Sequence, residues 1–272
     1  MDLQQHTSDL IEHISTALYK NIKDGYYLSS DINNKLNPSA VLFLLGPHCG
    51  ENGNESEPCL ILNKRSGKVK QPGDLCCPGG SVAPRVDSFF AKLLVLQSFP
   101  IARWPYWSGW RDHNPSEARQ LALFFATCLR ESFEEMRLNP FGVKFLGPLP
   151  PQRLEMFKRV IFPMAGWVSR QKKFVPNWEV EKVVYIPLRN LLTPDNYACY
   201  HLQFPSRLNR GTQDLPCFLY KNQGQSELLW GATYRIVTMF LSLIFRFTPP
   251  DMGSLPKIPG ILEGNYLTGN SE

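Results

Sequence analysis

A chain of 272 residues is long enough to bury a sizeable core in one domain. Hydrophobic residues make up 43% and charged residues 19%, a balance that excludes a disordered chain. The net charge of +5 suits an anionic small molecule such as a nucleotide, but it is too small and too scattered to indicate binding to a nucleic-acid polymer. The seven cysteines include no CxxC pair, and the N-terminus lacks the pattern of a secretory signal, so we expect a cytoplasmic protein with reduced thiols.

The N-terminal part of the chain predicts one helix followed by a hairpin. Leu10, Ile14 and Leu18 recur at helical spacing, which predicts an amphipathic helix at about residues 3–22. Two short apolar runs, 40–45 and 59–62, predict buried strands that pair with each other. The basic stretch 64–70 has two interpretations, either a solvated strand end or a loop that contacts phosphate.

A long helix is predicted in the middle of the chain. It starts at Pro115, with Asn114 as N-cap and Glu117 completing a capping-box-like arrangement. Asn139-Pro140 should stop the helix just beyond residue 137 or 138. Its core face should consist of Leu121, Phe125, Cys128, Leu129 and Ser132.

The C-terminal part predicts strands at 143–146, 160–168 and 182–186, then a helix at 228–247 and a tail without regular structure. A short helix is expected near Leu191. Arg235 and Arg246 argue against a membrane span in the last helix, and we predict no transmembrane segment. With no internal repeat, strands around a central helix indicate the α/β (α+β) class, a sandwich in a single domain.

The segment Leu129–Glu135, with the sequence LRESFEE, carries the most chemical information. On a helix, Glu131, Glu134 and Glu135 stand at i, i+3 and i+4, so their carboxylates share one face. Like charges at that spacing repel by about 0.2–0.5 kcal/mol per pair. A divalent cation would turn the repulsion into coordination, because hard cations such as Mg²⁺ take oxygen ligands. The alternative is a solvent-facing surface with an Arg130–Glu134 ion pair.

Together with Cys77-Pro78-Gly79-Gly80, this helix resembles the Nudix box, GX5EX7REUXEEXGU, in which U is a bulky aliphatic residue. Gly80 matches the first glycine, and Leu138 matches the last U. Arg130-Glu131 and Glu134-Glu135 match RE and EE. The resemblance implies a Nudix-type α/β/α sandwich, with a mixed sheet between helices and the box as loop–helix–loop. It also implies a hydrolase that cleaves a diphosphate linked to another moiety, with Mg²⁺ or Mn²⁺ as cofactor.

The resemblance assigns roles residue by residue. Glu134 and Glu135 would be metal ligands, and Glu131 a ligand or the base that orients the attacking water. A backbone carbonyl of Gly79 or Gly80 would complete the coordination. Arg130 would pair with a box carboxylate and hold it in place.

The box departs from the family pattern in four ways. Val86 stands where the glutamate after GX5 belongs, and Asp87, one residue later, either substitutes for it or leaves the role vacant. Ser132 replaces a bulky aliphatic residue, and Arg137 replaces the box glycine. Between Asp87 and Arg130 lie 42 residues, 88 to 129, where the family has seven, so 35 extra residues split the box; we place the insertion at about 88–114.

The insertion is rich in aromatic residues. Residues 103–111, RWPYWSGWR, contain three Trp, one Tyr and two Arg. They have two interpretations, a lid or base-stacking surface, or a satellite hydrophobic cluster or homodimer contact.

Several segments resemble the coenzyme A diphosphatase branch of the family. They are residues 62–66 with 73–80 (LLTxRS…G…FPGG), 161–166 (V-x-P-x-x-G), 176–180 (NPxEV) and 229–236 (IWGxTxRI). The histidine of the family's RxHxG is absent from the lead-in. If coenzyme A is the substrate, the products would be 3′,5′-ADP and 4′-phosphopantetheine. The resemblance then makes Arg65, Lys70 and Gly79 substrate contacts, with Glu179 either a further site carboxylate or the partner of a neighbouring lysine.

The sequence therefore predicts a metal-dependent hydrolase of a nucleoside-diphosphate-linked small molecule. Two other hypotheses remain. The departures Val86 and Arg137, together with the insertion, are compatible with a non-catalytic nucleotide-binding module on the Nudix fold. The apolar residues between Phe89 and Trp110 are compatible with a membrane-peripheral protein.

Overall fold

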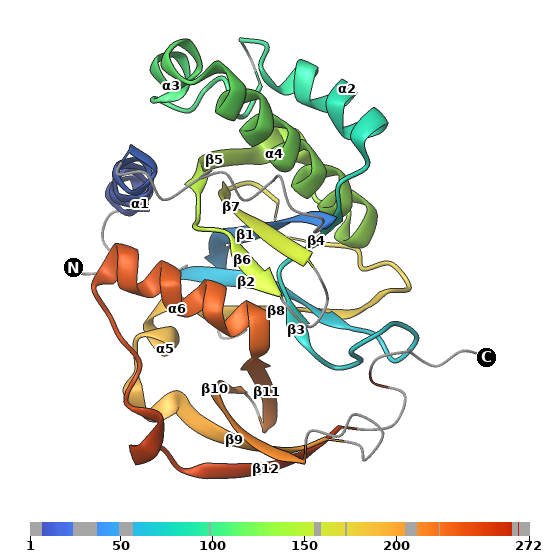
Figure 1. The fold of residues 1–272 in the computed structure, drawn as a ribbon, viewed down its shortest axis with the longest axis vertical. Helices are drawn as coiled ribbons and strands as arrows, with labels where there is room; N and C mark the ends of the chain where they lie inside the picture. The colour runs from blue at the N-terminus through green and yellow to red at the C-terminus, as the bar shows by residue number, and fades with distance from the viewer. Residues whose placement is uncertain are drawn as a thin grey trace. The chain divides into compact units, whose positions relative to one another are not determined.

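The computed structural model describes residues 7–23, 37–48, 57–97, 99–154, 159–171, 173–204, 211–222, 224–262 and 266 (Figure 1). The chain divides into two compact units. The first comprises Met1–Ile61 and Cys77–Val175, and the second Leu62–Cys76 and Pro176–Glu272. Helices and mixed strands confirm the α/β (α+β) class. The single Nudix domain expected from the sequence stays a prediction.

The first unit is built around the long helix α4. Its helices are α1 (Thr7–Asn21), α2 (Pro84–Leu94), α3 (Trp107–His113) and α4 (Pro115–Met136), followed by the 3-10 turn η3 (Pro140–Gly142). Its strands are β1 (Asn37–His48), the first residues of β2 (Glu57–Arg65), β4 (Gly79–Ser81), β5 (Val143–Pro148), β6 (Gln152–Leu154) and β7 (Arg159–Val168). The predicted N-terminal helix and the strand pair at 40–45 and 59–62 are thus present.

Strand β1 lies at the centre of the first unit's sheet. It pairs with β7 in parallel and with β2 and β4 in antiparallel fashion. β5 and β6 pair with β7. Leu42, Phe43 and Leu44 of β1 are fully buried, which explains the continuous apolar run, because a strand covered on both faces does not alternate. α4 packs on β1, β4 and β7, and α2 and α3 pack on α4.

Helix α4 has the predicted start and core face. Leu121, Phe125, Cys128, Leu129 and Ser132 are all buried. The capping prediction was wrong, because the Asn114 side chain makes no cap hydrogen bond. Asn114 is also the last residue of the preceding helical turn, where its backbone N–H donates to the Trp110 carbonyl. Its backbone is therefore held by α3, and α4 follows α3 without an intervening loop.

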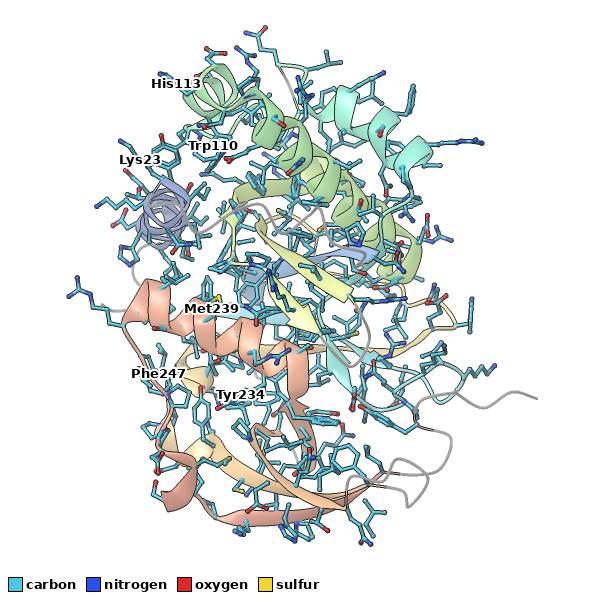
Figure 2. The ribbon with its side chains drawn as sticks, in the orientation of Figure 1. Lys23, Trp110, His113, Tyr234, Met239 and Phe247 are labelled. Atoms are coloured by element: carbon cyan, nitrogen blue, oxygen red, sulfur yellow. The ribbon has the colours of Figure 1, made fainter. Side chains whose placement is uncertain are left out.

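The aromatic insertion contributes to the core of the first unit. Trp104, Trp107 and Trp110 are only 2%, 4% and 6% exposed. The Trp104 Nε1–H donates to Ser15 Oγ at 3.0 Å and to the Leu146 carbonyl at 3.1 Å. Trp110 lies on the side of α3 toward α1, and its ring approaches Tyr19 at 6.4 Å (Figure 2). These contacts favour the packing interpretation of residues 103–111 over a lid.

The second unit contains a four-stranded sheet that the sequence did not indicate. Its order is β11 (Gln225–Trp230), β10 (Thr212–Asn222), β9 (Tyr197–Gln203) and β12 (Lys257–Ile261). The unit also contains β3 (Leu75–Cys76), β8 (Val180–Pro187), α5 (Leu188–Leu191), α6 (Gly231–Phe245), η5 (Pro194–Asn196) and η7 (Met252–Ser254). Tyr234 and Phe247, labelled in Figure 2, both approach the Tyr197 ring, at 6.2 and 5.8 Å.

Two C-terminal predictions were wrong. The helix expected at 228–247 starts only at Gly231, because residues up to Trp230 pair as β11 with β10. Gly231 has φ +65°, a backbone conformation that glycine adopts without strain and that separates strand from helix. The tail after Pro249 was expected to be irregular, but Lys257–Ile261 forms β12 in parallel with β9.

Candidate active site

The two halves of the split motif meet in the first unit. A Cβ placed on Gly80 would lie 2.5–2.7 Å from the carboxylate atoms of Glu131, so that carboxylate rests against the Gly80 backbone. The Gly79 N–H donates to Glu135 Oε2 at 3.3 Å. The PGG turn and α4 therefore contact each other directly, although the insertion separates them in sequence.

The glycines of the turn are required by the sheet. In β4, Gly79 lies opposite Val41 and Gly80 opposite Ala40 of β1. Gly79 has φ +149°, and a Cβ there would lie 2.4 Å from the Ala40 carbonyl oxygen. Only glycine fits such a close approach of two backbones. The register with β1 thus fixes the turn beneath the last two turns of α4.

Arg130 is the centre of the charged cluster. Its Nη1 lies 2.9 Å from Glu131 Oε1 and 3.3 Å from Glu134 Oε1, and its Nη2–H donates to the Ser81 carbonyl at 3.3 Å. Its Nε–H donates to Asp87 Oδ1 at 2.7 Å. One guanidinium therefore holds two carboxylates of α4 and links them to β4 and α2, as its planar fork of donors allows.

Asp87 belongs to this charged cluster, although the sequence did not decide whether it replaces the missing glutamate. Its side chain is 0% exposed and accepts hydrogen bonds from Arg130 Nε and Nη2, from Thr127 Oγ1 at 2.8 Å and from the Ala83 N–H at 2.6 Å. Its backbone N–H donates to the Ala83 carbonyl. Asp87 lies in the first turn of α2, so an acid one residue later than the family's glutamate reaches Arg130 from a helix that continues into the insertion.

Thr127 was missed by the sequence analysis. Its hydroxyl donates both to Asp87 Oδ2 and to the Leu123 carbonyl, and it is fully buried. The available signal was its position one turn before Arg130 on the same helix, since residues three apart lie on the same face.

The pKa values around Arg130 follow from burial and pairing. The hydrogen bonds to Asp87 raise the pKa of the Arg130 guanidinium above its ordinary value, so it stays charged. Burial raises the pKa of the Glu131 carboxyl, against the lowering effect of Arg130 beside it. Glu131 therefore keeps its proton to a higher pH than an ordinary glutamate does.

Helix α4 ends at Arg137, the residue that stands where the family pattern has a glycine. Arg137 adopts the left-handed conformation, with φ 56° and ψ 36°, and its N–H donates to the Phe133 carbonyl. Glycine is the residue that best tolerates this C-cap. Arg137 takes the same conformation, with its guanidinium carbon 5.1 Å from the centroid of the Phe133 ring.

The three glutamates have the donor chemistry of a divalent-cation site, because they offer carboxylate oxygens on one helix face beside the backbone of Gly79-Gly80. In the described residues, however, no three His, Cys, Asp or Glu side chains stand as a group that could hold a metal ion. Glu131 and Glu134 are engaged with Arg130, and Glu135 accepts from Gly79. The residue types fit a metal, while the carboxylates do not converge on one point.

The other predicted substrate contacts belong to the second unit. Arg65 Nε–H donates to the Lys70 carbonyl at 2.6 Å, which closes the loop between them. Ser66 N–H donates to the Glu179 carbonyl at 2.8 Å, so the loop before β8 is tied to the same segment. Lys64 forms ion pairs with Glu181 and Glu227. Contacts of Arg65, Lys70 or Glu179 with substrate stay predictions.

Comparison with known proteins finds two similar curated sequences. No family model matches it. The chain is 26% identical to the peroxisomal coenzyme A diphosphatase NUDT7 of Mus musculus over 196 residues, 70% of this chain and 65% of the mouse protein. It is 28% identical over 113 residues to the uncharacterized Nudix hydrolase NudL of Pectobacterium atrosepticum, 41% of this chain and 54% of that protein. The chain is similar in sequence to Nudix hydrolases. It resembles the coenzyme A diphosphatase branch.

The chain spans less than two thirds of the length of both curated relatives. Among solved structures, a Nudix hydrolase from Alicyclobacillus acidocaldarius overlaps 78% of this chain and 93% of its own, with 13% identity and a TM-score of 0.41. One from Nitrosomonas europaea overlaps 84% and 81%, with 12% identity and a TM-score of 0.39. In the described part of the chain, no helix is long and apolar enough to cross a membrane. The cytoplasmic location stays a prediction.

Proposed function

We propose that this chain is a divalent-metal-dependent hydrolase that cleaves the diphosphate bond of a nucleotide-linked small molecule, with coenzyme A or one of its derivatives as the first candidate. The observation that carries the proposal is the contact between Gly79-Gly80 and the carboxylates of Glu135 and Glu131. Two segments far apart in the chain contact each other, and together they carry the residue types that diphosphate hydrolysis needs.

The residues that would hold the metal are Glu131, Glu134 and Glu135, with a backbone carbonyl of Gly79 or Gly80. When bound, a divalent cation neutralises charge on phosphate oxygens and lowers the pKa of a water molecule. The chain's own groups would do the rest. Arg130, anchored by Asp87, positions Glu131 and Glu134. Glu131 would be either a ligand or the base that takes a proton from the attacking water, and its raised carboxyl pKa favours the second role, because a base works best when its pKa approaches the working pH.

The substrate assignment rests on sequence. The 26% identity to the mouse coenzyme A diphosphatase spans 196 residues, and the motif resemblances at 161–166, 176–180 and 229–236 agree with it. Coenzyme A would yield 3′,5′-ADP and 4′-phosphopantetheine. A screen of coenzyme A, acyl-coenzyme A esters, NADH, ADP-ribose and diadenosine polyphosphates, with chromatographic detection of the nucleotide product, tests the choice.

The reaction is tested by replacing single carboxylates. Glu134→Gln and Glu135→Gln are expected to lower Mg²⁺- or Mn²⁺-dependent turnover by about 100-fold or more, because each removes a charge that a metal-bound transition state would need. Glu117→Gln is the matched control: it makes the same change on the same helix, at the opposite end. Full turnover in either site variant, with an unchanged circular dichroism spectrum, would rule out the proposal.

A non-catalytic nucleotide-binding module is the second candidate. The observation that favours it is the engagement of Glu131 and Glu134 with Arg130 and of Glu135 with Gly79, which leaves the carboxylates apart. Titration calorimetry distinguishes the two. Tight binding of a nucleotide without any turnover in Mn²⁺, across the whole screen, would support the module.

A further inference from the structure

Helix α2, most of which lies in the insertion, has one buried side and one exposed side that is apolar. Asp87, Ala91 and Leu94 recur at i, i+4 and i+7 and are buried. The helix packs against α4 (Figure 1). The other side carries Val86, Phe89 and Phe90, which are 48%, 62% and 41% exposed. Leu96, just beyond the helix, is 51% exposed. We name Val86, Phe89, Phe90 and Leu96 the outer stripe.

The outer stripe is unusual for a protein surface. Single exposed apolar residues are common, but neighbouring ones that include two phenylalanines mark an interaction site. The Phe89 and Phe90 rings lie 6.0 Å apart, edge to face, so they form one continuous apolar surface. Neither ring takes part in the cluster around Arg130, and the proposed hydrolysis does not use them.

The charges of α2 are all of one sign on its exposed surface. Arg85 and Lys92 are exposed, whereas the one acid of the helix, Asp87, is fully buried against Arg130. Arg85 and Lys92 are seven residues apart, so on a helix they lie on one edge of the outer stripe. An apolar stripe bordered by basic residues is the pattern of a helix that lies in a membrane interface.

We propose that α2 docks on the surface of an anionic membrane, with the outer stripe at the boundary between headgroups and acyl chains and with Arg85 and Lys92 on lipid phosphates. The helix has 11 residues, about half of what a membrane span needs, so it would lie on the bilayer and not cross it. The inference does not depend on the proposed hydrolysis.

A second copy of this chain is a poorer occupant of the same surface. If two α2 helices paired antiparallel through the outer stripe, Arg85 of each would approach Lys92 of the other; if they paired parallel, like residues would meet. The exposed residues of α2 include no acid that offsets this repulsion. Anionic headgroups, in contrast, complement both cations at once.

The test is co-sedimentation of the full chain with vesicles. The protein is expected to bind vesicles of phosphatidylcholine mixed with phosphatidylglycerol, to bind pure phosphatidylcholine poorly, and to be released by salt. The double variant Phe89→Ser/Phe90→Ser should bind the vesicles at least about tenfold more weakly than the wild type. The double variant Arg85→Glu/Lys92→Glu should lose the preference for anionic vesicles. Ile261→Ser, which alters another exposed apolar residue (74%), should bind as the wild type does.

Two results would overturn the proposal. One is a wild-type protein that stays in the supernatant with both kinds of vesicle. The other is a dimer, seen by analytical ultracentrifugation, that Phe89→Ser/Phe90→Ser dissociates while vesicle binding is absent. Equal melting temperatures of the variants show that a loss of binding reflects the surface and not unfolding.

Discussion

Two aspartates, the buried Asp87 of the first unit and the partly buried Asp74 of the second, accept hydrogen bonds from different kinds of partner. Asp87 is 0% exposed, and its charged partner is the Arg130 guanidinium. Asp74 accepts hydrogen bonds from the neutral groups Trp230 Nε1–H, at 3.0 Å, and Tyr266 Oη–H. Burial raises the pKa of Asp74 to about 6, and the two hydrogen bonds and the charge of Arg65 offset that rise only in part.

The difference shows that the partner, and not burial alone, decides what a buried carboxyl contributes. A carboxylate that meets a guanidinium can remain charged inside a protein, whereas one that meets only neutral donors pays a desolvation cost when it ionises. The ion pair between Asp87 and Arg130 holds the guanidinium in place in the candidate active site. The hydrogen bonds that Asp74 accepts fix Tyr266 next to Trp230 in the apolar cluster of the second unit, which also includes Leu202 and Leu262. Four substitutions test the contrast.

The largest effect is expected from Arg130→Met. It leaves the fully buried Asp87 without its cationic partner, so the free energy of unfolding should fall by about 3–5 kcal/mol, and turnover should be lost. Urea denaturation measures the first and the nucleotide-release assay the second. Arg119→Met, an exposed site on the same helix, should change stability by less than about 0.5 kcal/mol. A loss below about 1 kcal/mol for Arg130→Met would contradict the pairing.

Asp87→Asn should cost about 1.5–3 kcal/mol, because the hydrogen bonds from Arg130 lose their charged acceptor and an amide N–H₂ group now faces the guanidinium. Turnover should fall by about 10–100-fold, since Arg130 positions Glu131 and Glu134 less well. Urea denaturation and steady-state kinetics give the two numbers. Unchanged kinetics in a well-folded variant would show that Asp87 has no part in positioning Arg130.

Thr127→Val keeps the shape of the side chain and removes its hydroxyl. The variant loses the donor to Asp87 Oδ2, so we expect a loss of about 1–2 kcal/mol and a smaller fall in turnover than for Asp87→Asn. In Asp87→Asn, adding Thr127→Val should cost less than it does in the wild type, because both changes disturb one network. Strict additivity of the two losses in a double-mutant cycle would show that the two residues act independently.

Asp74→Asn should have the smallest effect and the opposite sign at neutral pH. The folded state holds the Asp74 proton more tightly than the unfolded chain does, so wild-type stability falls as pH rises from about 3.8 toward about 6. The asparagine variant lacks this loss. It should melt close to the wild type at pH 4 and at a measurably higher temperature at pH 7. Calorimetric scans at both pH values check this, and a constant difference would contradict it.

The sequence predicted the elements whose pattern is local. The apolar runs of β1 and β2, the periodic core face of α4 and the PGG turn all follow from residue spacing within one element. Asp87 could not be placed, because its role depends on the start of α2 and on the Arg130 guanidinium, 43 residues later. The box spacing left open whether Asp87 takes the place of the missing glutamate, and the structure brings Asp87 to Arg130 on helix α2.

The second sheet was missed for a related reason. Trp230 continues an apolar run into α6, so periodicity alone extended the helix backward. Gly231 was the signal that separates the two, since glycine tolerates the positive φ of that junction. β12 carried no apolar alternation strong enough to indicate a strand, and its pairing with β9 is a long-range contact that local sequence does not encode.

Strand β1 contacts both halves of the split motif and so fixes their positions relative to each other. Gly79 and Gly80 are set by their register with Val41 and Ala40, and α4 packs on the same strand. The distance between turn and helix is therefore independent of the number of residues that connect them. A chain organised in this way can lengthen the connection, acquire new surfaces such as α2 and leave the spacing of the glutamates untouched.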